Sequence, residues 1–203
     1  MALAEKTAGP ELVEEDVLRA DLYDMLGGLL SRPPSADLLQ RVASLSGDGS
    51  DLGQAITALA TMANHLRPDA VETEFNQLFV GLTRGELLPY GSYYLTGFLH
   101  EKPLAALRND MRRLGIERAP NVYEPEDNMA SLCEMMAGLI RGTFGAGAPE
   151  ATQRDFYNAH IAPWAGHFFT DLEGAKASVF YAPVGAIGRV FMEIEREAFR
   201  MGA

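Results

Sequence analysis

Apolar side chains recur along this chain every three or four residues, which is the period of an α-helix with one buried face. The clearest stripe consists of Met129, Leu132, Cys133, Met136, Leu139 and Ile140. No segment alternates apolar and polar residues over the length of a strand. The pattern therefore predicts an all-α fold, a compact helical bundle of roughly nine to eleven helices.

Prolines and short polar side chains predict where the early helices begin and end. A first helix through residues 18–29 must stop before Pro33, because proline lacks an N–H donor and restricts the residue that precedes it. Ser35 is placed to cap a second helix. Asp51 followed by Gln54 resembles the capping box of a third helix.

The same reasoning places the later boundaries. Asp69 and Glu72 repeat the capping pattern for a fourth helix, and Gly115 is suited to the left-handed turn that ends a helix over residues 104–114. Pro163 should split a helix near Trp164, a residue expected in the core. The length of 203 residues fits one domain, which we place at residues 13–203 after a disordered tail at residues 1–12.

An acidic segment opens the most regular helix. In Glu124-Pro125-Glu126-Asp127-Asn128, Pro125 is suited to the first helical position, so the helix should begin there, with Glu124 just before it. Asp127 should then share an acidic face with Ser131 and Glu134. Carboxylates in a first turn are often explained by the helix dipole alone, and the alternative is a site for a cationic partner.

A second unusual segment, residues 83–94, departs from the helical pattern and contains Tyr90, Ser92, Tyr93 and Tyr94. We interpret it as a loop. Aromatic rings supply contact area and carboxylates orient cations, so the loop and the acidic segment together resemble the materials of a peptide-binding groove. Burial of the tyrosines in the core is the alternative interpretation.

Composition narrows the choice of partners. The chain has 17 Lys and Arg against 28 Asp and Glu, a net charge of −11, which disfavours nucleic acid and anionic membranes and favours a basic peptide. No apolar run approaches the roughly 20 residues of a membrane span, and the start lacks a signal layout, so we expect a cytoplasmic protein without stable membrane insertion. The single cysteine, Cys133, lies on the buried stripe and excludes an internal disulfide.

Catalytic patterns are missing from the sequence. The four histidines, at positions 65, 100, 160 and 167, lack the spacing of a helical metal site. No Walker motif occurs, and Ser92 has no Gly-x-Ser-x-Gly context. We therefore expect no enzyme activity, no metal and no cofactor.

Three segments, in order, resemble the TorD/DmsD family of chaperones for molybdenum-containing redox enzymes. They are Glu74-Phe75-Asn76-Gln77-Leu78-Phe79-Val80-Gly81, Pro89-Tyr90-Gly91-Ser92-Tyr93-Tyr94 and Glu124-Pro125-Glu126-Asp127. The downstream His160-x-x-Pro163-Trp164 also resembles the last third of that family, so the resemblance covers about residues 18–199.

The resemblance implies a cytoplasmic chaperone that binds the twin-arginine signal peptide and the apo form of a molybdopterin-dependent catalytic subunit, and that delays export until the cofactor is inserted. The export translocase is a further partner in this scheme, and a homodimer is left open. The family's signal-binding region maps onto Tyr90, Ser92, Tyr93, Glu124, Asp127 and Asn128. Asn128 stands where the family commonly has histidine, so that position cannot become cationic.

Two alternatives remain at this point. A chaperone for a molybdoenzyme subunit without a cleavable signal, of the nitrate-reductase-assembly type, is the nearest. An all-helical ligand-binding regulator would need a basic recognition helix, whereas the N-terminal region is acidic.

Overall fold

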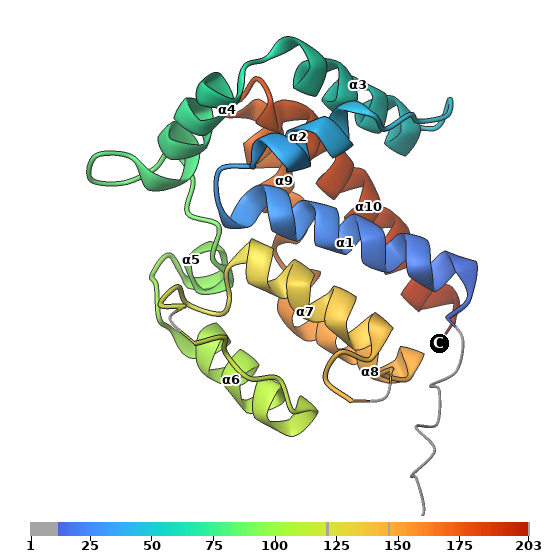
Figure 1. Cartoon of the computed structure of the whole chain (residues 1–203). Helices are drawn as coiled ribbons and strands as arrows, with labels where there is room; N and C mark the ends of the chain where they lie inside the picture. The colour runs from blue at the N-terminus through green and yellow to red at the C-terminus, as the bar shows by residue number, and fades with distance from the viewer. Residues whose placement is uncertain (1–11, 121, 146, 203) are drawn as a thin grey trace, which may run out of the picture.

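The computed structural model describes residues 12–120, 122–145 and 147–202, and the regular secondary structure of this part of the chain is helical (Figure 1). It contains ten α-helices and two π-helical turns, within the predicted range, and no strand. The elements in order are α1 (Glu14–Ser31), α2 (Ala36–Ala43), α3 (Asp51–His65), α4 (Pro68–Phe75), η1 (Asn76–Val80), α5 (Gly91–Thr96), α6 (Lys102–Leu114), α7 (Met129–Arg141), α8 (Glu150–Phe156), η2 (Tyr157–Ile161), α9 (Ala165–Gly174) and α10 (Tyr181–Met201).

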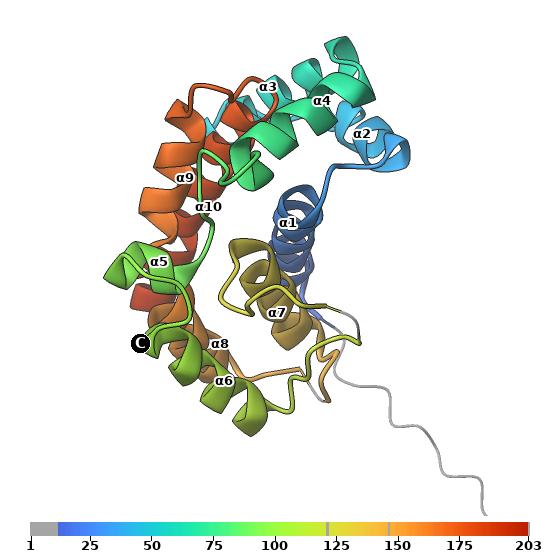
Figure 2. The same ribbon diagram turned by 90° about the vertical axis from the view of Figure 1, so that its left-hand side faces the viewer.

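Helix pairs form the body of the molecule. The most extensive packing joins α1 to α7, which are far apart in the sequence, and α9 to α10, which follow one another (Figure 1). Helices α2 and α3 pack on each other, and α3 also packs on α10. Figure 2 shows α5 and α6 at the opposite end of the molecule from α2, α3 and α4. None of the described helices combines the length and the apolar character that a membrane crossing requires.

The core is rich in aromatic rings. Trp164, Phe168 and Phe169 are almost completely buried, with ring centroids of consecutive members 5.8 and 5.0 Å apart. The expectation that Trp164 belongs to the core is confirmed. Cys133 is also fully buried, and burial raises the pKa of its thiol, so the thiolate that would react is disfavoured.

Several predicted helix ends are confirmed. Helix α1 ends at Ser31 ahead of the proline pair, and the Ser35 hydroxyl accepts a hydrogen bond from the Leu38 N–H at 3.2 Å. Gly115 follows α6 in the left-handed conformation at φ 69°, which a residue without Cβ adopts at little cost. Helical structure is interrupted before α9, around Pro163, as expected.

Two predicted caps are wrong. Ser50, rather than Asp51, caps α3, because its hydroxyl accepts the Gly53 N–H at 3.1 Å. Helix α4 begins at Pro68 with Arg67 in the cap position, and Asp69 pairs with Arg67 instead of capping. In both cases the N-cap is a residue one or two positions earlier in the chain than the capping pattern predicted.

The predicted loop over residues 83–94 is also partly wrong, since Gly91–Thr96 forms α5. The six-residue helix is too short to show a periodic stripe in the sequence. The disordered tail predicted for residues 1–12 lies almost entirely outside the described residues, so the proposed domain boundary stays a prediction.

One buried carboxylate fastens the start of α10. Glu74 on α4 is 7% exposed, and its oxygens accept the backbone N–H groups of Val179, Phe180 and Tyr181 at 2.7, 3.0 and 2.8 Å. The first N–H groups of a helix lack partners inside the helix. Glu74 satisfies them from a segment about a hundred residues earlier in the chain.

We expect Glu74→Ala to lower the free energy of unfolding by about 3 kcal/mol, because it leaves buried donors unpaired. Thermal and urea denaturation followed by circular dichroism measure the loss. Glu72→Ala, on the exposed side of the same helix, is the matched control and should change stability little. Equal stability of the two variants would contradict the role given to Glu74.

Candidate functional site

Backbone pairing brings the tyrosine segment and the acidic segment together. The Gly91 N–H donates to the Asp127 carbonyl and the Met129 N–H donates to the Pro89 carbonyl, both at 2.9 Å. These two bonds frame an isolated antiparallel bridge between Tyr90 and Asn128. The segments are more than thirty residues apart in the chain, and the bridge joins the starts of α5 and α7. All six predicted site residues belong to these two segments.

The acidic segment does not form the first turn of α7. Asn128 is the N-cap, and its side-chain oxygen accepts the Ala130 N–H at 2.9 Å, so α7 begins at Met129 and not at Pro125. Asparagine is among the best N-cap residues, whereas Pro125 lies in the preceding turn, where its carbonyl accepts the Asn128 N–H at 3.2 Å. The position at which the family commonly has histidine is therefore a capping position in this chain.

Asp127 is buried rather than displayed. Its side chain is 3% exposed, and one carboxylate oxygen accepts the Ser92 N–H in the first turn of α5 at 2.6 Å. The predicted acidic face shared with Ser131 and Glu134 does not exist, because Asp127 precedes the helix. Asp127 instead acts as a cap for α5, a helix that has no side-chain cap of its own.

Ser92 is fully buried beside Asp127. Within the described part of the chain, neither the Ser92 hydroxyl nor the second Asp127 oxygen has a hydrogen-bond partner. The two residues are therefore inaccessible to a ligand in this structure, and they hold the start of α5 in position.

Tyr90 and Glu124 form the accessible part of the site. Glu124 is exposed and Tyr90 half-buried, and the Tyr90 hydroxyl donates a hydrogen bond to the Glu124 carboxylate. Partial burial and the adjacent Glu124 raise the pKa of Tyr90, so its hydroxyl stays protonated and donates. The bond to Tyr90 thereby holds the Glu124 carboxylate in a fixed direction.

Tyr93 lies on the next turn of α5 and already contacts a guanidinium group. Arg84 donates to the Tyr93 hydroxyl at 2.6 Å, and its guanidinium carbon lies 5.1 Å from the centre of the ring. The distance is within the range of cation–π attraction. The Tyr93 ring therefore shows that this face of the protein accommodates an arginine side chain.

An indole forms the floor beneath α5. The Trp164 Nε1–H donates to the His160 carbonyl at 2.8 Å, and the Tyr94 ring lies 5.3 Å from the indole. A Cβ added to Gly91 would approach Trp164 Nε1 to 3.0 Å, which is closer than nearly all real contacts. Glycine at position 91 thus lets α5 sit directly on the buried indole.

The third carboxylate of the acidic segment is occupied by two arginines. Glu126 accepts Arg108 at 2.8 Å and Arg118 at 2.7 Å. Burial alone would raise the pKa of Glu126, but the hydrogen bonds from these guanidinium groups and from its own backbone outweigh it and lower the pKa. Of the three carboxylates expected to receive a cation, only Glu124 is exposed and without an arginine.

Apolar side chains extend the accessible surface around α5. Leu95 and Phe98 are 44% and 70% exposed near its end, and Tyr123, next to Glu124, is 86% exposed. Sequence reasoning missed Phe98, Tyr123 and the arginine partners of Glu126. The signal available in the sequence was that these aromatic residues lie outside any periodic apolar stripe, which is typical of exposed positions. Among the described residues, no three histidine, cysteine or carboxylate side chains are arranged to hold a metal ion.

The sequence and the fold are similar to those of known proteins. The chain is 26% identical to the chaperone protein TorD of Aliivibrio salmonicida over 198 residues, which are 87% of this chain and 92% of the relative. It is also 26% identical to TorD of Vibrio cholerae, with 88% and 90% covered. A crystal structure from Archaeoglobus fulgidus, provisionally named a redox enzyme maturation protein, matches 87% of this chain and 94% of its own with a TM-score of 0.56 and 20% identity.

These similarities define the class as all-helical proteins of the TorD type. The chain belongs to the family described as the nitrate reductase delta subunit, whose model matches residues 46–170, more than half of the sequence. The family resemblance drawn from the three sequence motifs is thereby confirmed. The two relatives above are named as chaperones rather than enzymes, as expected.

We expect Asp127→Ala to lower the free energy of unfolding by about 1–3 kcal/mol, since it removes the cap of α5 from a buried position. Amide hydrogen exchange at residues 91–96 should become faster. Glu124→Ala, on the exposed side of the same segment, should leave both quantities unchanged. Unaltered exchange in the Asp127 variant would show that the carboxylate does not hold α5.

The Glu126 ion pairs predict a pH dependence. A carboxylate whose pKa is lowered by folding stabilises the protein above its ordinary value of 4.5 and loses this contribution as the pH falls through the lower folded value. Glu126→Gln should therefore cost about 1 kcal/mol at pH 7, a Tm decrease of roughly 2–4 °C. The difference from the unaltered protein should shrink below pH 4.5.

Thermal denaturation of both proteins between pH 3 and pH 7 tests this expectation. Glu117→Gln removes an exposed carboxylate from the same connecting segment and controls for net charge. A Tm difference that stays constant through the acid range would contradict the ion-pair explanation.

Proposed function

We propose that this protein is a cytoplasmic chaperone that binds the twin-arginine signal peptide and the apo form of a molybdopterin-dependent oxidoreductase subunit. Family membership and the similarity to TorD chaperones support the class. The observation that carries the proposal is the exposed Glu124 carboxylate, which is oriented by Tyr90 at the start of α5, the helix whose Tyr93 ring already contacts a guanidinium group.

The proposed site divides its six residues into two roles. Tyr90, Tyr93 and Glu124 contact the peptide, because they reach the surface. Ser92, Asp127 and Asn128 position them, because their contacts cap α5 and α7 and close the bridge between the two segments. This division explains why buried and exposed residues share one short stretch of sequence.

Arginine is the residue that this surface suits. A guanidinium donates two parallel hydrogen bonds to a carboxylate and stacks on an aromatic face, whereas an ammonium group does neither in the same way. One signal arginine would pair with Glu124, and the second would take the place of Arg84 on the Tyr93 ring. The net charge of −11 would steer the basic peptide toward the protein.

Charge alone would give weak binding. An exposed ion pair contributes only about 0–1 kcal/mol and is screened by salt. The apolar stretch that follows the arginines in a signal peptide would supply more, at roughly 25 cal/mol per Å² buried. The exposed side chains of Leu95, Phe98 and Tyr123 offer this contact. Holding the peptide there would keep the client from export until its cofactor is inserted.

A second candidate is a chaperone for a subunit without a cleavable signal. It is favoured by the description of the matching family, the nitrate reductase delta subunit. The high coverage of the TorD relatives favours the first candidate. A client with and without its N-terminal leader separates the two, since only the first candidate loses most of its affinity when the leader is removed.

We expect a twin-arginine signal peptide to bind with one-to-one stoichiometry and its Lys-Lys version to bind more weakly. Glu124→Gln should weaken binding of the Arg-Arg peptide by up to about fivefold, equivalent to about 1 kcal/mol, because the charged partner of one arginine is lost. Isothermal titration calorimetry at two salt concentrations measures both effects.

Glu117→Gln, with the same charge change at another exposed position, is the control and should bind normally. Equal weakening by the two variants would reduce the effect to net charge. Normal binding by the Glu124 variant, with its fold intact, would place the arginine site elsewhere.

A further inference from the structure

An exposed turn between η1 and α5 brings an arginine of the protein itself to the candidate site. Residues 82–84 are exposed, and Arg84 donates to the Tyr93 hydroxyl at 2.6 Å, with its guanidinium carbon 5.1 Å from the centre of the ring. Tyr93 is one of the three residues that the proposed function places in contact with the client peptide. A guanidinium group of the chaperone therefore occupies a ring to which that function assigns a guanidinium group of the client.

Backbone contacts fix the turn that carries Arg84. The Leu87 N–H donates to the Leu78 carbonyl at 2.8 Å, which folds the turn back onto η1. Gly81 has a φ of 63°, and a Cβ at this position would lie only 2.0 Å from the Arg84 carbonyl oxygen. The Glu86 carboxylate accepts two backbone N–H groups of the segment before α10, at 2.7 and 3.1 Å. Arg84 is thus presented to α5 from a defined backbone position.

The contact between Arg84 and Tyr93 is one that a ligand can break. The Arg84 side chain is exposed, and within the described part of the chain its guanidinium donates to no group other than the Tyr93 hydroxyl. A cation over an exposed ring changes an equilibrium constant by a factor of only about two to five. A displaced Arg84 would leave no buried charge unpaired and would regain its rotamer freedom in solvent.

Tyr93 keeps its position through contacts that do not involve Arg84. The Asp127 carboxylate accepts the Ser92 N–H at 2.6 Å, and the bridge between the two segments holds the start of α5. At the other end of this short helix, the Gly97 N–H donates to the Tyr93 carbonyl at 2.8 Å. The fold therefore does not require the Arg84 contact to place the ring.

We propose, building on the function proposed above, that Arg84 is an intramolecular competitor for the Tyr93 ring, an autoinhibitory contact that a client arginine displaces. An incoming guanidinium makes the same bond to the hydroxyl and the same contact with the ring, so the exchange replaces like with like. An ammonium group lacks the planar surface that stacks on a ring, and its exchange is less favourable. The contact lowers the affinity for the peptide and covers the ring while no client is bound.

Removal of the competitor should strengthen peptide binding. We expect Arg84→Gln to bind the Arg-Arg signal peptide about threefold more tightly than the unaltered protein, because the ring is no longer occupied. The Lys-Lys peptide should gain less, since lysine makes poorer use of the ring. Isothermal titration calorimetry with the full chain measures both affinities, and thermal denaturation should show an unchanged fold, because Arg84 is exposed.

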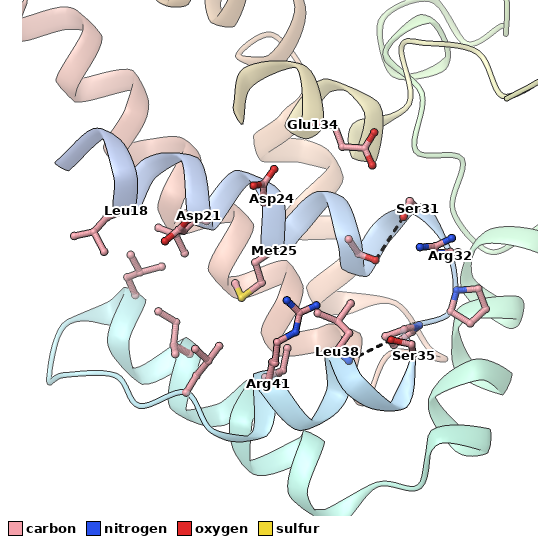
Figure 3. Close-up of a pocket in the computed structure, with 18 of the residues that line it drawn as sticks. Leu18, Asp21, Asp24, Met25, Ser31, Arg32, Ser35, Leu38, Arg41 and Glu134 are labelled. Carbon is pink, nitrogen blue, oxygen red and sulfur yellow. Dashed lines mark hydrogen bonds between the residues drawn. The ribbon is translucent and has the colours of Figure 1, made fainter. Parts of the chain in front are cut away.

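Two further variants separate occupation of the ring from other effects. Arg41→Gln makes the same change in net charge at an exposed position on α2, beside a hollow of about 940 Å³ that shares no residue with the candidate site (Figure 3). It should bind both peptides as the unaltered protein does. Tyr93→Leu removes the ring, and combining it with Arg84→Gln should bring no gain over Tyr93→Leu alone, because the competitor acts through the ring.

A small probe tests the competition without a peptide. Arginine amide, titrated into protein with ¹³C-labelled tyrosine, should shift the ring resonances of Tyr93, which the spectrum of Tyr93→Leu identifies. Half-saturation should occur at an arginine amide concentration about two to five times lower in Arg84→Gln, since the apparent affinity follows the fraction of sites that are open.

Four results would overturn the inference and leave the proposed function in place. They are unchanged affinity of Arg84→Gln for an Arg-Arg peptide that the unaltered protein binds, weaker binding by Arg84→Gln, an equal gain in Arg41→Gln, and an equal gain in the Tyr93→Leu background. The opposite outcome is also distinct. If no form binds the peptide while arginine amide reaches Tyr93 more readily in Arg84→Gln, the proposed function is rejected and the competition at the ring is retained.

Discussion

The candidate site depends on the pairing between Pro89–Gly91 and Asp127–Met129. Two backbone bonds of 2.9 Å and the Asp127 cap join the starts of α5 and α7. These two helices are not among the extensively packed pairs of the described structure. The bridge also sorts the carboxylates of one short segment. Asp127 turns inward as a cap, Glu126 meets two arginines, and Glu124 faces solvent. A sequence that looks uniformly acidic thus yields one available charge.

Carboxylates that satisfy distant backbone donors recur in this molecule. Glu74 caps the start of α10 from α4, and Glu86 accepts the Lys176 and Ala177 N–H groups at 2.7 and 3.1 Å. Such bonds satisfy backbone N–H groups that have no partner within a helix. The excess of acidic residues therefore has an architectural part in addition to its part in attracting basic partners.

The sequence predicted the helices well and their exact starts less well. Long stripes such as Met129–Ile140 follow from helical periodicity, and Gly115 and Ser35 follow from backbone and capping chemistry. The start of α7 was misplaced because Pro125 is a good first residue locally, while the bridge to Tyr90 imposes a different conformation. Whether a carboxylate is buried or exposed depended on contacts with residues 35 positions away, which no local pattern contains.

Gly91 and Trp164 illustrate how closely two remote positions depend on each other. The indole is held by its bond to the His160 carbonyl and lies within 3.0 Å of where a Cβ on residue 91 would be. A side chain at position 91 would therefore force the buried indole at position 164 to shift by a few tenths of an ångström. Over evolutionary time, these two sites should vary as one unit or stay fixed together.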